Sequence, residues 1–281
     1  VRRFHGDPRL DGGRRRSDVI AVVLEPIQCG AGVVVQPPGY LASASRLCRE
    51  SGALLVVDEV QTGLGRTGRM LALEHEGIVP DVVTLAKALG GGKAPIAACV
   101  ARREVWMRAF GGAGDAMLHA STFGGMGGAC ATATETLNVI VEEGLVENAS
   151  SVGAYLSDRL LEVSRRHPAL VAGIRGRGLL VGIALADPAS VLPGALRDRL
   201  PALAKAGEGA LAALVAMALL HDHDVLVAFT EYSRNVLRIE PPLAFSRGDA
   251  DRLVTALDAV LGSGIEGMIA SAVRVMASRH G

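Results

Sequence analysis

This sequence contains few lysines and few aromatic residues, and neither charge is in excess. Aromatic residues make up 3% of the chain, and 29 basic side chains balance 29 acidic ones. A chain without net charge gives no electrostatic reason to expect binding to nucleic acid or to an acidic membrane surface. Lysine occurs only at Lys87, Lys93 and Lys205, so any amine chemistry must use one of these three residues.

Closely paired cysteines and long apolar runs are also missing. Cys29, Cys48, Cys99 and Cys130 show none of the short spacings typical of zinc sites or disulfide frameworks, so we expect reduced, buried thiols and no metal. The longest apolar stretch, Ala210 to Leu220, is shorter than a membrane span requires. We therefore expect a soluble, cytoplasmic protein that does not enter a membrane.

The first half of the sequence alternates short β-branched runs with longer amphipathic ones. This alternation predicts an α/β fold with a parallel sheet and crossover helices. The runs concerned are 19–24, 39–51, 54–57, 82–85 and 96–100. Residues 2–17 lack periodicity and are expected to form a loop.

The second half predicts a smaller lobe of mixed α+β topology. Leucine and valine at helical spacing predict a helix over 147–166, which His167-Pro168 ends. Further strands are expected at 179–184 and 225–229, a helix at 248–261, and a surface insertion at 187–209. Placing the boundary inside the long helix gives a large domain over 1–155 and a small domain over 156–281.

Asp58 and Lys87 each follow a predicted strand. Ligands of open α/β sheets bind at the carboxyl ends of strands, so the two side chains are expected to converge on one crevice. A lysine amine there can form a Schiff base with an aldehyde cofactor, and a carboxylate can keep a pyridine nitrogen protonated. From spacing alone, a turn-capping Asp58 and a solvated Lys87 at a helix end remain the alternative.

A nucleotide-hydrolase interpretation of the same region fails. Asp58-Glu59 resembles an acidic strand-end motif, and the stretch 90–93 resembles a phosphate loop. A Walker-type loop requires a glycine and a Ser or Thr at the places that Lys87 and Ala94 occupy here.

Six motifs in order resemble the class III aminotransferases, which are pyridoxal-phosphate enzymes of fold type I. They read LEPIQCGAGVVVQPPGYL, LLVVDEVQTGLGRTGRM, PDVVTLAKALGGGKAPIAA, HASTFGG, GRGLLVGI and VLRIEPPL. The likeness extends from about residue 19 to 261, and within the class it is strongest to the putrescine and diamine branch. The resemblance implies transfer of an amino group from a diamine or amino acid to a 2-keto acid in two half-reactions.

The resemblance implies four contacts with the ring and the aldehyde end of the cofactor. Lys87 is expected to hold pyridoxal 5'-phosphate as a Schiff base and then to move the substrate proton. Asp58 is expected to pair with the pyridine nitrogen, Val60 to pack on the ring face, and Gln61 to lie near the ring hydroxyl.

Three further residues are assigned roles by resemblance. Thr122 is similar to the threonine that binds the cofactor phosphate across a subunit interface, which implies a homodimer. Glu25 and Arg238 match positions on the substrate side, where Arg238 would hold a carboxylate by a two-pronged contact. The alternatives are that Arg238 pairs only with Glu240 and that Thr122 is an ordinary turn hydroxyl. His119 is expected to be structural.

The sequence departs from the family at three places. Met126-Gly127 stands where Asn-Pro is usual, and Gly30 stands where ornithine-type enzymes carry a glutamate. The family's chains are longer at the N-terminus, so the resemblance implies an incomplete large domain that lacks the glycine-serine phosphate loop. A catalytically incomplete, dimerising remnant therefore stays open, as does a mutase, decarboxylase or racemase on the same scaffold.

Overall fold

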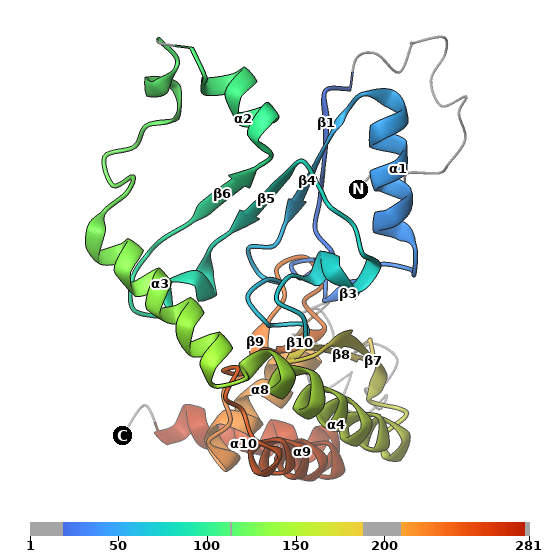
Figure 1. Cartoon of the computed structure of the whole chain (residues 1–281). Coiled ribbons are helices and arrows are strands. Elements are labelled where there is room, and N and C mark those ends of the chain that lie inside the picture. The colour runs from blue at the N-terminus through green and yellow to red at the C-terminus, as the bar shows by residue number, and fades with distance from the viewer. Residues whose placement is uncertain (1–18, 113, 188–208, 279–281) are drawn as a thin grey trace.

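The computed structural model describes residues 19–112, 114–187 and 209–278, which form two lobes with a sheet in each (Figure 1). The loop expected over 2–17 lies outside the described residues, as does the insertion expected over 187–209 apart from its two end residues.

The first lobe is built on a four-stranded sheet of order β1-β4-β5-β6. β1 (Ala21–Leu24), β4 (Leu54–Asp58) and β5 (Val82–Leu85) run parallel, whereas β6 (Ala98–Ala101) runs antiparallel to β5. The expected α/β fold with a parallel-rich sheet is therefore confirmed, and the exception is β6, which was expected to run parallel. Only the short 3₁₀ helix η3 (Lys87–Gly90) lies between β5 and β6, so the chain turns back where a crossover would have continued.

Helix α1 (Tyr40–Ser51) covers one face of this sheet. Its buried Leu41 and Cys48 pack with Leu55 and Val57 of β4, as the alternation of side chains along a strand requires. A small hairpin of β2 (Ile27–Gln28) and β3 (Val34–Val35) joins β1 to α1, and the 3₁₀ helix η2 (Ala72–Glu76) lies between β4 and β5.

After β6 the chain leaves the sheet along the outer side of the first lobe (Figure 1). It forms α2 (Arg103–Phe110) and the 3₁₀ helix η4 (Ala116–His119), and returns through α3 (Gly127–Glu142). The ring of His119 packs on Trp106 and Phe110, with centroids 5.3 and 5.2 Å away, in agreement with a structural His119.

The second lobe carries an antiparallel sheet of order β7-β8-β10-β9. The strands are β7 (Val171–Arg177), β8 (Leu180–Leu185), β10 (Val236–Ile239) and the short β9 (Ala228–Phe229). Antiparallel strands packed with helices confirm the expected α+β lobe, although β7 and β10 were not foreseen as strands.

Four helices cover this sheet and form the largest core of the described chain. They are α4 (Leu145–Arg166), α8 (Ala210–His223), α9 (Arg247–Gly262) and α10 (Gly264–Ser278). Helix α9 begins at a capping box, in which the Ser246 hydroxyl accepts from the N–H of Asp249. The core already includes Ala149 of α4, and the predicted boundary between 155 and 156 stays a prediction.

Three backbone segments meet without intervening side chains where the two lobes touch. A Cβ on Gly153 of α4 would lie 2.3 Å from the carbonyl carbon of Gly178, in the turn between β7 and β8. A Cβ on Gly178 would lie 2.6 Å from the carbonyl carbon of Thr67 in the first lobe, and its φ of +58° favours glycine in any case. Both positions therefore require glycine.

The expectation of four buried thiols holds for only two of the cysteines. Cys29 and Cys48 are buried as expected, but Cys99 and Cys130 are exposed, so the expectation of four buried thiols is wrong. Cys99 is exposed on β6 at one edge of the first sheet.

Within the described ranges no single helix has the length and hydropathy to cross a membrane. Residues 247–262 and 264–275 reach that threshold only as a pair bent by 104°.

Candidate active site

Asp58 and Lys87 lie at the carboxyl ends of adjacent parallel strands. Asp58 is the last residue of β4 and pairs in register with Thr84 of β5, and Lys87 follows β5 directly after Ala86. The Thr84 hydroxyl donates to Asp58 Oδ1 at 3.1 Å, and the N–H of Val60 donates to the same oxygen at 2.9 Å. The expected convergence of the two strand ends is therefore present.

The carboxylate of Asp58 has one oxygen left for a ligand. Both of its hydrogen bonds go to Oδ1, and no described residue donates to Oδ2. The hydrogen bond from the N–H of Val60 is the contact expected of an Asp58 that only caps a turn. Asp58 therefore does stabilise the turn, and its Oδ2 is still available as an acceptor. An ionised carboxylate with a free oxygen is the partner that a protonated pyridine nitrogen requires.

Lys87 occupies a backbone conformation that a side chain rarely adopts. Its φ is +47°, in the left-handed region, a conformation that costs of order 1 kcal/mol or more for a non-glycine residue. The turn is held in place because Leu89, two residues on, is buried in a small core with Leu64, Ala133 and Ile140. The exposed Lys87 amine donates to Gln61 Oε1 at 2.6 Å.

A chain of polar contacts continues from Gln61 into the second lobe. Gln61 Nε2 donates to Glu240 Oε2 at 2.8 Å, and Arg238 Nε lies 3.1 Å from that same oxygen. Arg66 Nε lies 3.9 Å from the other oxygen, Glu240 Oε1. Glu240 thus lies between two guanidinium groups and the amide that holds Lys87.

Glu25 and Cys29 complete this polar neighbourhood. Burial is the largest cause that raises the pKa of the Glu25 carboxyl, and the charge of Asp58 adds to the rise, against the N–H of Cys29 and the charge of Lys87. Burial followed by the charge of Glu240 raises the pKa of Cys29 to about 12, so this thiol stays neutral and unreactive at physiological pH.

Glu59 has a different role from its neighbour Asp58. It is only 1% exposed and accepts from the N–H of Leu73 at 2.7 Å and from the hydroxyl of Thr62 at 2.5 Å. Burial is the main cause of its raised pKa. Glu59 therefore stabilises the loop between β4 and β5.

Thr122 is the predicted site residue that the described chain does not bring to the others. It is exposed in the loop between η4 and α3, and no hydrogen bond in the described residues joins it to Asp58 or Lys87. Val60 is half-buried next to Asp58 and Gln61, and its contact with a cofactor ring stays a prediction. The described residues thus gather candidate partners for the aldehyde and the ring nitrogen of the cofactor, but not for its phosphate.

Glu240 and Arg66 are the site residues to which sequence reasoning gave no role. Glu240 appeared only as a possible partner of Arg238. The signal was its spacing, because side chains two residues apart in an extended segment lie on the same face, and Glu240 directly follows β10. Arg66 carried no such signal, since its contact with Glu240 spans the two lobes.

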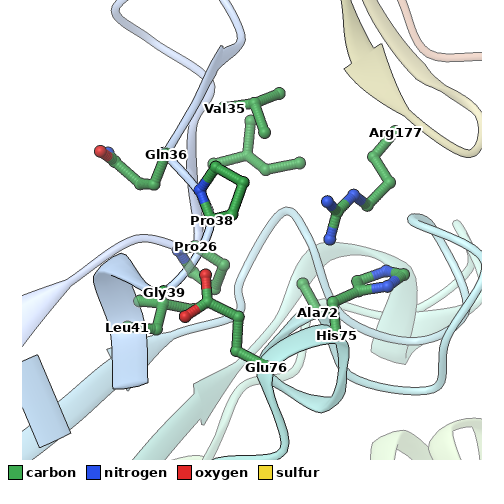
Figure 2. A pocket seen from close by; sticks show the side chains of 11 residues that line it. Pro26, Val35, Gln36, Pro38, Gly39, Leu41, Ala72, His75, Glu76 and Arg177 are labelled. Atoms are coloured by element: carbon green, nitrogen blue, oxygen red, sulfur yellow. The ribbon is translucent and has the colours of Figure 1, made fainter. Parts of the chain in front are cut away.

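A separate cavity of about 190 Å³ lies elsewhere on the junction of the lobes (Figure 2). Pro26, Pro38 and His75 line it from the first lobe, and Arg177 lines it from β7. None of the seven predicted site residues lines this cavity, so it is not the crevice at the strand ends.

Comparisons with known proteins identify the class and then the family. The solved relatives of this chain are pyridoxal-phosphate aminotransferases of fold type I. The family described as aminotransferase class-III matches residues 10–261 of the chain. The chain belongs to the class III aminotransferases, a family of pyridoxal-phosphate-dependent transaminases.

The relatives are longer than this chain. Aminotransferase PigE of Serratia sp. (strain ATCC 39006) is 40% identical over 272 residues, which cover 87% of this chain and 32% of that protein. Ornithine aminotransferase from Toxoplasma gondii is 34% identical with a TM-score of 0.74, covering 88% of this chain and 52% of that one. A Bacillus anthracis aminotransferase is 31% identical, with a TM-score of 0.73, and the match covers 86% and 52% of the two chains. The chain spans about half the length of these solved relatives.

Proposed function

We propose that this chain carries the lysine-bearing part of an aminotransferase that moves an amino group from a diamine or amino acid to a 2-keto acid. The observation that carries the proposal is the placement of Lys87 and Asp58 at neighbouring strand ends, with one Asp58 oxygen free. Bound pyridoxal phosphate would supply the electron-accepting ring on which both half-reactions depend.

The residues of this chain have distinct tasks in that reaction. Asp58 Oδ2 would keep the ring nitrogen protonated. Lys87 Nζ would attach the cofactor and, once freed, carry the proton that leaves the substrate carbon. Gln61 holds this amine in the free chain through its Oε1. Arg238 would orient the carboxylate of an amino acid or keto acid by paired hydrogen bonds.

We propose a diamine as one amino donor. Support comes from the resemblance of the stretch 225–243 to the putrescine and diamine branch. The carboxylates of Glu25 and Glu231, which interact electrostatically, offer a negative region for a second amine. The raised pKa of Glu25 limits this attraction at acidic pH.

A homodimer is part of the proposal. The loop that bears Thr122 and the preceding 3₁₀ helix η4 carry apolar side chains in solvent, with Phe123 of the loop 76% and Met117 of η4 78% exposed. Covering them with a second copy would remove an unfavourable apolar surface. The threonine hydroxyl would then be placed to reach the cofactor phosphate of that copy.

Reduction with borohydride tests the cofactor assignment directly. The purified chain is incubated with pyridoxal phosphate, reduced, digested and mapped by mass spectrometry. We expect a cofactor adduct on Lys87 that Lys87→Ala abolishes, while Lys93 provides the internal control for unspecific labelling. Adducts spread equally over the lysines would refute the assignment. Their complete absence would favour a non-catalytic remnant of the fold.

The products formed from labelled donors distinguish transamination from the other reactions of this scaffold. A transaminase releases a carbonyl product and aminates the keto acid in equal amounts. A decarboxylase would release carbon dioxide, and a mutase would consume no keto acid.

A further inference from the structure

Three contacts connect the amine of Lys87 to the guanidinium of Arg238. They run from Lys87 to Gln61 at 2.6 Å, from Gln61 to Glu240 at 2.8 Å, and from Glu240 to Arg238 at 3.1 Å. The first two residues belong to the first lobe and the last two to the second. We call these four residues the relay.

The chemistry of its two ends fixes the orientation of the relay. A lysine ammonium only donates hydrogen bonds, and a carboxylate only accepts them. The Gln61 amide must therefore direct its oxygen to Lys87 and its nitrogen to Glu240. The reverse orientation would set two donors together at one end and two acceptors at the other. Glu240 thus determines which way Gln61 faces, although it does not contact Lys87.

The contact at the Arg238 end is close but poorly aligned. Arg238 Nε is buried and has no hydrogen-bond partner in the described chain, even though Glu240 Oε2 lies 3.1 Å away. A buried donor without a partner is unfavourable. A free carboxylate can approach the guanidinium in plane and accept two parallel hydrogen bonds, so it would compete well for Arg238.

We infer that Glu240 is a positioning residue that couples Arg238 to Lys87. A carboxylate-bearing substrate that binds Arg238 draws the guanidinium away from Glu240. The substrate carboxylate also places a second negative charge beside the carboxylate of Glu240. Glu240 then shifts, Gln61 loses its fixed orientation, and the amine of Lys87 is released. This inference rests on the proposed function, because it assigns the coupling to the same site and to substrates with a carboxylate.

Trace acetylation of the cofactor-free chain measures the release of Lys87. The ratio of acetylated Lys87 to acetylated Lys93 is determined by mass spectrometry, with and without glutarate as a dicarboxylate probe. Lys93 is exposed and outside the relay, so it reports unspecific changes in reactivity. Sodium chloride at equal ionic strength controls for screening. We expect glutarate to raise the ratio about fivefold, as for loss of one hydrogen bond of typical strength.

Variants separate the coupling from a general effect of charge. In Glu240→Gln the ratio should already be raised, and glutarate should add nothing. Glu240→Asp keeps the charge and should recover part of the response. Glu266→Gln removes an exposed carboxylate of the same lobe, on α10, that lies outside both the relay and the proposed donor site, and it should respond like the wild type. Gln61→Met interrupts the relay from the other lobe and provides a second variant should Glu240→Gln fail to fold.

Two results would overturn the inference. One is a Lys87 ratio in the wild type that does not change with glutarate, whether or not calorimetry detects binding. The other is a Glu240→Gln or Gln61→Met variant that responds as the wild type does. Neither depends on cofactor trapping, so the coupling and the proposed aminotransferase function can fail separately.

Discussion

Replacing Glu59 by alanine should destabilise the chain while leaving the neighbouring Asp58 site chemically intact. The two carboxylates are adjacent at the end of β4, but successive side chains of a strand point to opposite faces. Asp58 offers a free oxygen to a ligand, whereas Glu59 uses both of its oxygens inside the protein.

The magnitude follows from the partners that Glu59→Ala leaves behind. The buried N–H of Leu73 and hydroxyl of Thr62 both lose their acceptor. A buried polar group left without a partner costs roughly 1–3 kcal/mol, so we expect the free energy of unfolding to fall by about 3 kcal/mol. For a chain of this size that corresponds to a melting temperature lower by roughly 6–12 °C.

Urea denaturation followed by circular dichroism measures this loss. Glu59→Gln should lose only about 1 kcal/mol, because its amide oxygen can accept from Leu73 while its nitrogen donates to Thr62. Asp58→Asn is the matched control and should stay within about 0.5 kcal/mol of wild type, since an amide oxygen can accept both present bonds. An unfolding free energy of Glu59→Ala equal to that of Asp58→Asn would refute the reasoning.

The difference in stability between wild type and Glu59→Gln should also depend on pH, in a direction that the pKa of Glu59 determines. Burial raises the pKa of Glu59 above its usual 4.5 in the folded chain. A raised carboxyl pKa means that its contribution to stability is fully present below about pH 4.5 and is lost as the pH rises through the folded value. The stability of wild type relative to Glu59→Gln should therefore increase as the pH is lowered from 7 toward 4.5. A constant difference would contradict the assignment.

Two further predictions concern packing and assembly. Gly153→Ala should lower the free energy of unfolding by about 2 kcal/mol or more, because its methyl group would overlap the backbone of Gly178; Gly173→Ala, which has open space, should cost far less. Phe123→Ser should weaken a homodimer in analytical ultracentrifugation, whereas Tyr232→Ser, equally exposed on the second lobe, should not. An unchanged dimer in Phe123→Ser would exclude this loop from the interface.

The sequence located the two central residues because their signal is local. Asp58 and Lys87 each end an apolar run, and a strand end is visible in the run itself. The direction of β6 is not visible in this way, since a short apolar run is compatible with either orientation. β7 escaped prediction because the glycines and arginines of 171–177 interrupt the alternation that marks a strand.

Contacts between the lobes account for most of what the sequence did not reveal. Gln61 and Glu240 are far apart in the sequence, and no local pattern indicates that their side chains meet. The unusual φ of Lys87 likewise depends on the packing of Leu89 in another core. Cys99 belongs to the predicted run 96–100, but its exposure depends on what covers the sheet. The cytoplasmic location, the homodimer and the roles of all seven predicted site residues stay predictions.

The contact of Gly153, Gly178 and Thr67 has a mechanical consequence for the whole molecule. Side chains act as compliant spacers between packed elements, because rotamer changes absorb small displacements. Here α4, the β7–β8 turn and the first lobe touch through bare backbone, which has no comparable freedom. Rocking of one lobe against the other should pivot about this point.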